Sequence, residues 1–314
     1  MFKQFADWIT YSLLNLQKGN QLAESLNFFI YDIPKIYFLL LTVVFVVAFI
    51  RSFLPPQKIK SILSHRHEIF GNISAAVLGI FVPFCTCSAI PLFIGMLESG
   101  VPLGVTMSFL VSSPMINEVA LVLLWGLFGW KIAITYIASG LVIAVFSGFI
   151  IGRLKMEKYV EKFALPADNT ENKKALSFSE RIINSFNYSF ETFKYLWFYI
   201  LIGVGVGALI HGYVPINLVS KLAGGRSPLA VIIAVILGVP LYANCAGAIP
   251  VVQAILGKGM ALGTSLAFMM AVTGLSLPEF FILRKVLKPQ LLVTFFSVVA
   301  VGIIIVGNLF NIIF

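Results

Sequence analysis

The sequence predicts an all-α polytopic membrane protein with two inverted structural repeats, and with proline-broken or re-entrant segments containing cysteine at its centre. Hydrophobic residues make up 59% of the 314 residues and charged residues only 11%, whereas soluble domains carry about 25% charged residues. Several apolar runs also reach about 18 residues, the length that crosses a bilayer as a helix. A proline- and cysteine-containing motif that occurs twice predicts the repeats and their centre.

The apolar runs divide the chain into four regions. Trp8, Tyr11 and neighbouring rings favour the head-group level of a membrane, so we expect interfacial amphipathic helices at the start. The first clear apolar span runs from Ile33 to Ile50, and a hydrophilic stretch separates two apolar halves. The predicted organisation is interfacial helices over 1–31, a first membrane repeat over 32–152, a cytoplasmic hydrophilic linker over 153–194 and a second membrane repeat over 195–314.

The second half repeats the first at an interval near 160 residues. Pro91 matches Pro250, and the sequence Gly100–Gly104 resembles Gly259–Gly263. Random similarity among apolar helices gives one such match, but ordered matches at a near-constant interval indicate an internal repeat. The glycines four residues apart are typical of close helix packing.

The basic loops predict the relative orientation of the repeats. They cover 51–66, 153–194 and Arg284-Lys285-Lys288, and the positive-inside rule places all three in the cytoplasm. That placement requires 69–97 to enter and leave on one face, as a hairpin bent near Pro83–Cys87. Each half then crosses an odd number of times, so the repeats are inverted, a common transporter plan. If 69–97 crosses straight through, the repeats are parallel and one basic loop is misplaced.

The repeated motif covers Val82–Pro91 and returns at Val239–Pro250, and all three cysteines lie in these paired motifs. Non-helical backbone survives in a membrane only where it is buried in protein or lines a cavity, so thiols there would face a cavity. Soft thiolates bind Cu(I), Zn(II) and, by the same logic, trivalent arsenic; the alternative is that each cysteine is a small buried hydrophobe. No metal site is assigned beyond the thiols of Cys85, Cys87 and Cys245 as thiophilic candidates. The expected substrate-binding residues are Cys85, Thr86, Cys87, Ser88, Ser113, Asn117, Asn244 and Cys245.

Two acids lie in apolar runs and are the proton-coupling candidates. Glu118 lies deep in the run 101–125, and Glu279 lies five residues before Arg284. An acid inside a span is costly and usually faces a cavity or a partner, so it is a functional candidate by default. An interfacial ion pair is the alternative for Glu279.

Polar helix breakers precede both acids. They predict unwound helices whose ends direct their dipoles at a substrate, although an ordinary proline kink is the alternative. The two breakers are Ser112-Ser113-Pro114 and Thr273-Gly274-Leu275-Ser276-Leu277-Pro278.

Three first-half segments and two second-half segments resemble the family of predicted permeases that includes the bacterial YraQ-type proteins and the organoarsenical efflux permease ArsP. The first-half segments are Pro83-Phe84-Cys85-Thr86-Cys87-Ser88-Ala89-Ile90-Pro91-Leu92-Phe93, Gly100-Val101-Pro102-Leu103-Gly104-Val105-Thr106 and Ser108-Phe109-Leu110-Val111-Ser112-Ser113-Pro114-Met115-Ile116-Asn117-Glu118. The second-half segments surround Asn244-Cys245 and Ser276-Leu277-Pro278-Glu279. The resemblance covers nearly the whole chain. It implies a multi-pass permease of the bacterial inner (plasma) membrane and, for the ArsP branch, efflux of trivalent organoarsenicals.

The second motif departs from the first in one respect that matters for the site. It has Asn244-Cys245-Ala246 where the first has Cys85-Thr86-Cys87, which excludes a symmetric four-thiol site.

The leading hypothesis is a secondary transporter that exports a small thiophilic solute through a midplane site between the repeats. A transmembrane thiol–disulfide electron carrier with a thiol-redox partner, and a passive channel, are the alternatives. No base–nucleophile constellation or cofactor motif appears, so we expect no enzyme and no cofactor. The net charge of +9 suits anionic lipid head groups rather than nucleic acid, because the basic residues lie in short loops. Homo-oligomerisation is left open.

Overall fold

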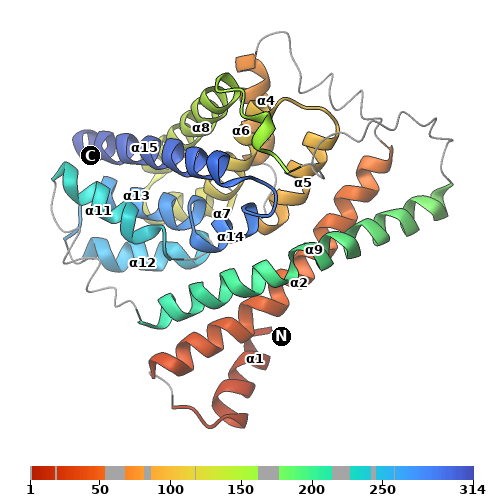
Figure 1. Ribbon diagram of the computed structural model, residues 1–314. Helices are drawn as coiled ribbons and strands as arrows, with labels where there is room; N and C mark the ends of the chain where they lie inside the picture. Colours follow the sequence, from red (N-terminus) through yellow and green to blue (C-terminus); the bar gives the residue numbers. More distant parts are fainter. Residues whose placement is uncertain are drawn as a thin grey trace.

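The computed structural model describes residues 2–17, 20–53, 68–80, 86–116, 118–161, 177–213, 227–241, 245–257 and 259–314. The regular structure of these residues is helical (Figure 1), which confirms the predicted all-α class. The first half contains the α-helices α1 (Phe2–Asp7), α2 (Gln21–Phe53), α4 (Glu68–Ile80), α5 (Thr86–Glu98), α6 (Leu103–Met115), α7 (Glu118–Phe128) and α8 (Trp130–Arg153), with the π-helix η1 (Trp8–Leu13) and the 3₁₀ turn η2 (Glu157–Tyr159). The second half contains α9 (Phe178–Tyr213), α11 (Pro228–Gly238), α12 (Cys245–Gly257), α13 (Leu262–Gly274), α14 (Leu277–Leu283) and α15 (Pro289–Ile313).

Four stretches of the described helices are long and apolar enough to cross a membrane. A fifth is added if α6 and α7, which meet at a bend of 47°, form one broken span. Several apolar helices of this length agree with the predicted polytopic membrane protein. The four stretches are Gln21–Val46, Trp130–Arg153, Leu262–Leu283 and Pro289–Ile313.

Two helices begin earlier than the hydropathy pattern indicates. The predicted first span starts at Ile33, but α2 starts at Gln21; the predicted linker runs to 194, but α9 starts at Phe178. Both extensions belong to the α2–α9 pair, whose rings and polar groups contact along its length. The Phe49 and Phe178 ring centroids are 5.7 Å apart, and the Tyr37 hydroxyl donates a hydrogen bond to the Trp197 carbonyl oxygen at 2.7 Å. Phe178 packs in the early turns of α9, and Phe29, in the early turns of α2, lies 3.4 Å from a Cβ atom built on Gly205, so partners far apart in sequence contact both extensions.

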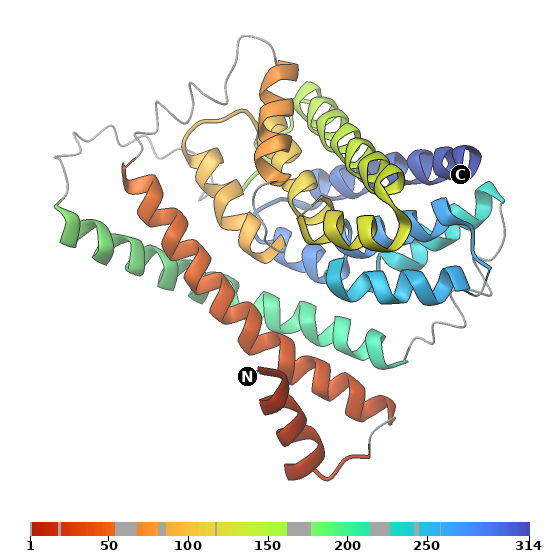
Figure 2. The same ribbon diagram turned by 180° about the vertical axis from the view of Figure 1, so that it is seen from behind.

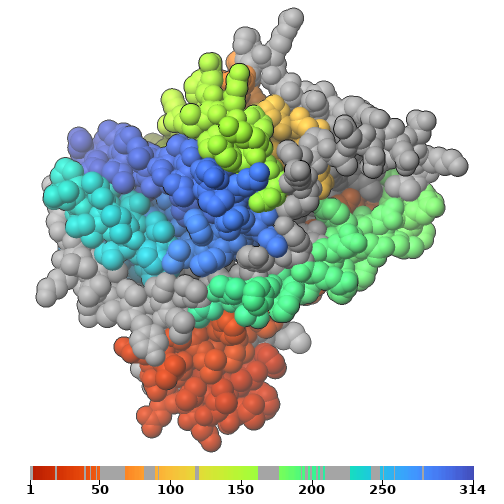
Figure 3. All heavy atoms as spheres, in the orientation of Figure 1, coloured from red at the N-terminus to blue at the C-terminus, as the bar shows by residue number. Residues whose placement is uncertain are grey.

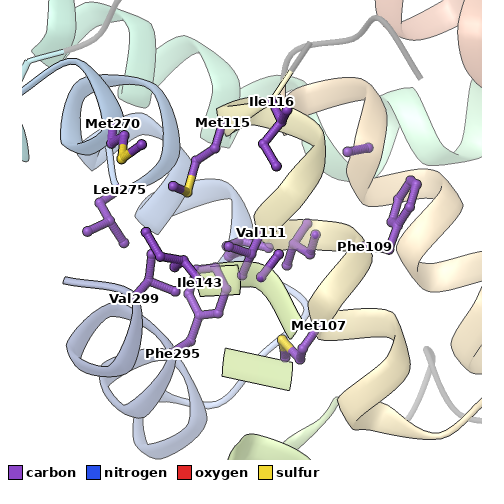
Figure 4. Packing of buried hydrophobic residues seen from close by; sticks show 14 of the residues in the cluster. Met107, Phe109, Val111, Met115, Ile116, Ile143, Met270, Leu275, Phe295 and Val299 are labelled. Carbon is purple, nitrogen blue, oxygen red and sulfur yellow. The ribbon is translucent and has the colours of Figure 1, made fainter. Parts of the chain in front are cut away.

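The helices form a bundle with α2 and α9 laid across one side of it, as the opposite views of Figures 1 and 2 show. Inside the bundle, α6 packs against α4 and α8, and α13 packs against α11 and α15. Every residue of α6 from Leu103 to Met115 is buried, and so is every residue of α13 from Gly263 to Gly274. A helix buried on all faces lies in a protein core, so α6 and α13 form the centre of the molecule. Figure 4 shows Met107, Phe109 and Phe295 packed there.

Equivalent glycines make the closest helix contacts in each half. A Cβ atom on Gly104 of α6 would lie 2.6 Å from the Gly148 carbonyl oxygen of α8. A Cβ atom on Gly263 of α13 would lie 2.6 Å from the Asn311 backbone nitrogen of α15 and would overlap the Gly307 carbonyl oxygen. Gly263 follows Gly104 by 263 − 104 = 159 residues, and Gly307 follows Gly148 by the same interval. Glycine lets these backbones approach closely, as expected for membrane helices.

The turns before α6 and α13 also need glycine. Gly100 has φ +76° and Gly259 has φ +87°, in the left-handed region that glycine adopts without strain. The Gly100 N–H donates to the Leu97 carbonyl at 2.9 Å, and the Gly259 N–H donates to the Leu256 carbonyl at 2.9 Å. These turns reverse the chain so that α5 leads into α6 and α12 leads into α13.

Candidate functional site

Two helices end inside the molecule, at the predicted breakers. Helix α6 contains Pro114 in its last turn and stops at Ile116, which is extended with φ −124° and ψ 101°. Helix α13 stops at Leu275, with φ −136° and ψ 26°. Because proline has no N–H to donate, it weakens the helix around it. Both breaks are buried, since Ile116 and Leu275 are each 0% exposed.

The two breaks lie against each other. A Cβ atom on Gly274 would lie 2.6 Å from the Met115 side chain, so a larger residue at 274 would displace that side chain. Figure 4 shows Met115 on the side of Met270 and Leu275, whereas the Ile116 side chain lies against Gly140 of α8. The hydroxyl of Tyr136 on α8 donates to the Met115 carbonyl oxygen at 3.2 Å. This bond satisfies a backbone acceptor at the broken end of α6.

Buried polar side chains surround the breaks. Ser113 is 0% exposed, and its hydroxyl makes no hydrogen bond within the described part of the chain. Ser276 and Glu279 are each 2% exposed and lie at the start of α14. The Thr273 hydroxyl bonds back to the Met269 carbonyl at 2.9 Å. The structure therefore gathers Ser113 and Glu279, two of the predicted site residues, into the buried region around the breaks.

The helices that begin in the two cysteine motifs pack on the short helices that follow the breaks. Helix α5 contacts α14, and α12 contacts α7. The Leu277 N–H, at the start of α14, donates to the Val239 carbonyl at 2.9 Å. Val239 is the first residue of the second motif, so this bond connects the second break to that motif.

The remaining predicted residues differ in how far the structure describes them. Cys85, Asn117 and Asn244 lie outside the described residues. The backbone of the other five lies in the first residues of α5, α7 and α12: Thr86, Cys87, Ser88, Glu118 and Cys245. Among the described residues, no three His, Cys, Asp or Glu side chains form a metal-binding group.

Glu118 and Glu279 occupy different positions in the first turns of their helices. Glu118 is the first residue of α7, whereas Glu279 is the third residue of α14. Arg284, the alternative partner of Glu279 in the sequence prediction, forms an ion pair with Glu161 at 3.9 Å.

Sequence reasoning missed three buried polar residues. Asp32, on α2, is 8% exposed; it falls just before the predicted start of the first span. Asn72 is 2% exposed and Ser108 is 0% exposed, and neither Asn72 Oδ1 nor Ser108 Oγ has a hydrogen-bond partner in the described regions. The signal for all three was present, since each is an isolated polar residue inside a helix of the membrane region.

Charged residues gather at one end of the bundle, which we call the basic end and define by Glu68, Arg153 and Lys288. Arg153 pairs with Glu68 at 3.5 Å. The backbone N–H of Lys288 donates to the Tyr159 carbonyl at 2.8 Å, and the Lys288 ammonium donates to the Lys158 carbonyl at 3.2 Å. The chain next to each predicted basic loop therefore lies at this end, although 54–67 and 162–176 themselves lie outside the described residues.

Comparison with known proteins assigns the chain to a family. A family model described as a predicted permease (ArsP_1) matches residues 21–312. The chain belongs to this predicted permease family. It is 24% identical to UPF0718 protein MJ0584 of Methanocaldococcus jannaschii, over 76% of this chain and 81% of that protein. It is 25% identical to UPF0718 protein YraQ of Escherichia coli, over 76% of this chain and 67% of that protein.

A third relative is named as part of an assembly. The putative two-component membrane permease complex subunit of Streptococcus mutans is 23% identical, over 82% of this chain and 81% of that protein. No solved structure matches. The family and the apolar helices together indicate a multi-pass membrane protein of the transporter type rather than an enzyme.

Proposed function

We propose that this permease is a secondary transporter that exports a small thiophilic solute, such as a trivalent organoarsenical, through a site between two inverted repeats. The observation that carries the proposal is the contact between two buried helix breaks, Met115 at the end of α6 and Gly274 at the end of α13. Discontinuous helices that meet near the midplane form the substrate site in many transporters. The family supports the transport class.

Helix directions support the inverted arrangement. Helix α8 ends at the basic end and α15 begins there, because Lys288, just before α15, bonds to Tyr159, just after α8. Helix α6 begins beside Gly148 and Gly152, near the end of α8, whereas α13 begins beside Gly307, near the end of α15. Helix α6 therefore starts from the basic end and α13 from the opposite end. The two three-helix units run in opposite directions.

Helix lengths support a re-entrant first motif. Helices α4 and α5 have 13 residues each, about 20 Å of helix, whereas the hydrocarbon core is about 30 Å thick. Helix α4 begins at the basic end, where Glu68 pairs with Arg153. Four residues separate the end of α5 from the start of α6, and α6 also begins at the basic end. These placements support the proposed segment that enters and leaves on one face. In that arrangement the start of α5 at Thr86 is expected at the same depth as the end of α6.

Thiol chemistry supports the substrate class. Two protonated thiols condense with the two As–OH groups of methylarsenite, forming two As–S bonds and releasing two water molecules, and the reverse reaction releases the solute. Soft thiolates favour this exchange over binding of hard ions. Cys85, Cys87 and Cys245 are the proposed ligands, with Thr86, Ser88, Ser113, Asn117 and Asn244 around them. Glu118 and Glu279 are the proposed proton carriers, since an intramembrane acid can titrate when the solute leaves.

The test is flux of methylarsenite in proteoliposomes that contain the full-length protein. Wild type should give saturable, gradient-dependent flux, and replacing all three cysteines by serine should reduce it to the level of empty vesicles. Ser139→Ala on α8, whose hydroxyl bonds within its own helix to the Tyr136 carbonyl, is the matched control and should transport normally. Full flux in the triple variant would overturn the site. Absence of flux in wild type, together with a trapped mixed disulfide, would favour the electron-carrier alternative.

A further inference from the structure

An open surface pocket of about 400 Å³, which we call the N-terminal cavity, lies between α1, η1 and α2. The two segments are held together by Asn27, whose side-chain amide donates to Asp7 Oδ1 at 2.9 Å and to Thr10 Oγ1 at 3.4 Å. In Figures 1 and 2, α1 lies beside the N-terminal part of α2, away from the helix bundle. Six residues line the cavity: Lys3, Tyr11, Glu24, Asn27, Phe28 and Tyr31.

The two charges in this cavity have opposite sign and do not pair with each other. Neither the Lys3 ammonium nor the Glu24 carboxylate forms an ion pair with any residue that the structure describes. Both groups nevertheless line the same space. A cavity with one free charge of each sign fits a ligand that carries both signs.

Three aromatic rings complete the lining. Tyr11, Phe28 and Tyr31 offer faces and edges to a ligand, and ring faces attract ammonium groups. One ring already has a cation next to it, since the Lys35 ammonium lies 5.1 Å from the Tyr31 ring centroid. Because Lys35 already lies over Tyr31, a ligand ammonium is expected beside Glu24 and the rings of Tyr11 and Phe28, whereas an anionic group is attracted toward Lys3 and Lys35.

The surroundings of the cavity match the boundary between head groups and acyl chains. Exposed apolar side chains occur on the same segments, with Trp8 55%, Leu13 62% and Leu22 57% exposed. Exposed tryptophan is typical of membrane interfaces. The start of α2 and the cavity lie at the other end of α2 from Phe49, which packs on Phe178 at the start of α9. Figure 3 shows the N-terminal residues as a lobe on the far side of α9 from α8 and α15.

We propose that this cavity binds the head group of a phospholipid that carries both a phosphate and a primary ammonium group, as phosphatidylethanolamine does. Lys3 binds the phosphate, Glu24 and the aromatic rings bind the ammonium, and the acyl chains lie along Trp8, Leu13 and Leu22. The cavity volume lies in the range of about 300–1,000 Å³ found for small-molecule sites. The inference does not depend on the transport function.

The test is native mass spectrometry of the full-length protein released from nanodiscs with equal phosphatidylethanolamine and phosphatidylglycerol. Wild type should retain phosphatidylethanolamine preferentially. Glu24→Gln should reduce that preference by about threefold to tenfold, because it removes the ammonium partner but not the phosphate partner. Lys3→Gln should reduce retention of both lipids.

Glu157→Gln and Lys155→Gln, two exposed positions near the basic end, are the matched controls and should retain lipid as wild type does. Circular dichroism and thermal unfolding verify that each variant is folded. Equal retention of the two lipids by wild type, or an unchanged preference in folded Glu24→Gln protein, would overturn the site. Displacement of the lipid by free phosphoethanolamine would overturn the lipid assignment in favour of a soluble zwitterion.

Discussion

The three-helix units α4–α6–α8 and α11–α13–α15 use the same glycines but differ in polarity. A Cβ atom on Gly79 of α4 would lie 3.1 Å from the Phe109 carbonyl oxygen, and a Cβ atom on Gly238 of α11 would lie 3.1 Å from the Phe268 carbonyl oxygen. The same interval of 159 residues relates a polar side chain in the first unit to an apolar one in the second. These pairs are Asn72 and Val231, Ser108 and Ala267, Ser112 and Ala271, Ser113 and Val272, and Ser147 and Val306.

The comparison shows that close helix packing requires the shared glycines but does not require the polar residues of the first unit. Close backbone approach needs a position without a Cβ atom, so glycine recurs in both units. Polarity at these five positions is not needed for that approach, because the second unit packs with valine and alanine there. Since buried polar groups without partners are destabilising in lipid, the oxygens of Asn72, Ser108 and Ser113, which have no partner within the described chain, make these three positions the ones to test for a role beyond packing.

The largest expected effect comes from adding a Cβ atom at the shared glycines. Gly263→Ala should lower the free energy of unfolding by about 1–3 kcal/mol, because the new atom meets the backbone of α15, which cannot rotate away. Gly104→Ala should act similarly through α8. Thermal unfolding in detergent measures both. Gly126→Ala is the control, since its Cβ would meet nothing within 4 Å; destabilisation as large as that of Gly263→Ala would contradict the contact explanation.

A smaller effect is expected from removing a pair of hydrogen bonds between α13 and α15 in the second unit, which we call the Asn311 clamp. The Asn311 amide donates to Thr264 Oγ1 at 2.9 Å, and Asn311 Oδ1 accepts from the Thr264 N–H at 3.2 Å, whereas Gly152 occupies the equivalent place in the first unit. Asn311→Ala should therefore cost about 1 kcal/mol. Asn308→Ala removes a bond to Ile304 within the same helix, and the same unfolding assay should show a smaller loss. Equal losses would mean that the clamp does not hold the two helices together.

The smallest effect on stability is expected where the first unit is made to resemble the second. Ser108→Ala introduces the residue found at Ala267 and removes a hydroxyl that bonds to none of the described groups. Its free energy of unfolding should stay within about 0.5 kcal/mol of wild type or rise. Ser185→Ala is the control, because it removes a bond to the Arg181 carbonyl at 2.7 Å. Methylarsenite flux should fall in Ser108→Ala if this polarity serves transport; unchanged flux would assign Ser108 to packing alone.

Local sequence patterns predicted some features of the site and not others. The proline and serine residues before Glu118 and Glu279 predicted the helix breaks, because proline limits a helix wherever it occurs. The contact between Met115 and Gly274 could not be predicted, since it joins residues far apart in the chain. The sequence predicted interfacial helices over 1–31 but not that helix continues unbroken from Gln21 into the first apolar span, because hydropathy alone separates the two regions.

The sequence by itself determined the all-α class, the membrane environment and the permease family. These follow from the apolar fraction, the length of the apolar runs and the motifs around Cys85 and Glu118, all of which are local properties. Only the tertiary structure decided that α6 and α13 form the buried centre, that their broken ends meet, and that Asn72 and Ser108 are buried. The physical reason is that burial and closeness depend on which helices pack together, and many helix arrangements satisfy the same hydropathy pattern.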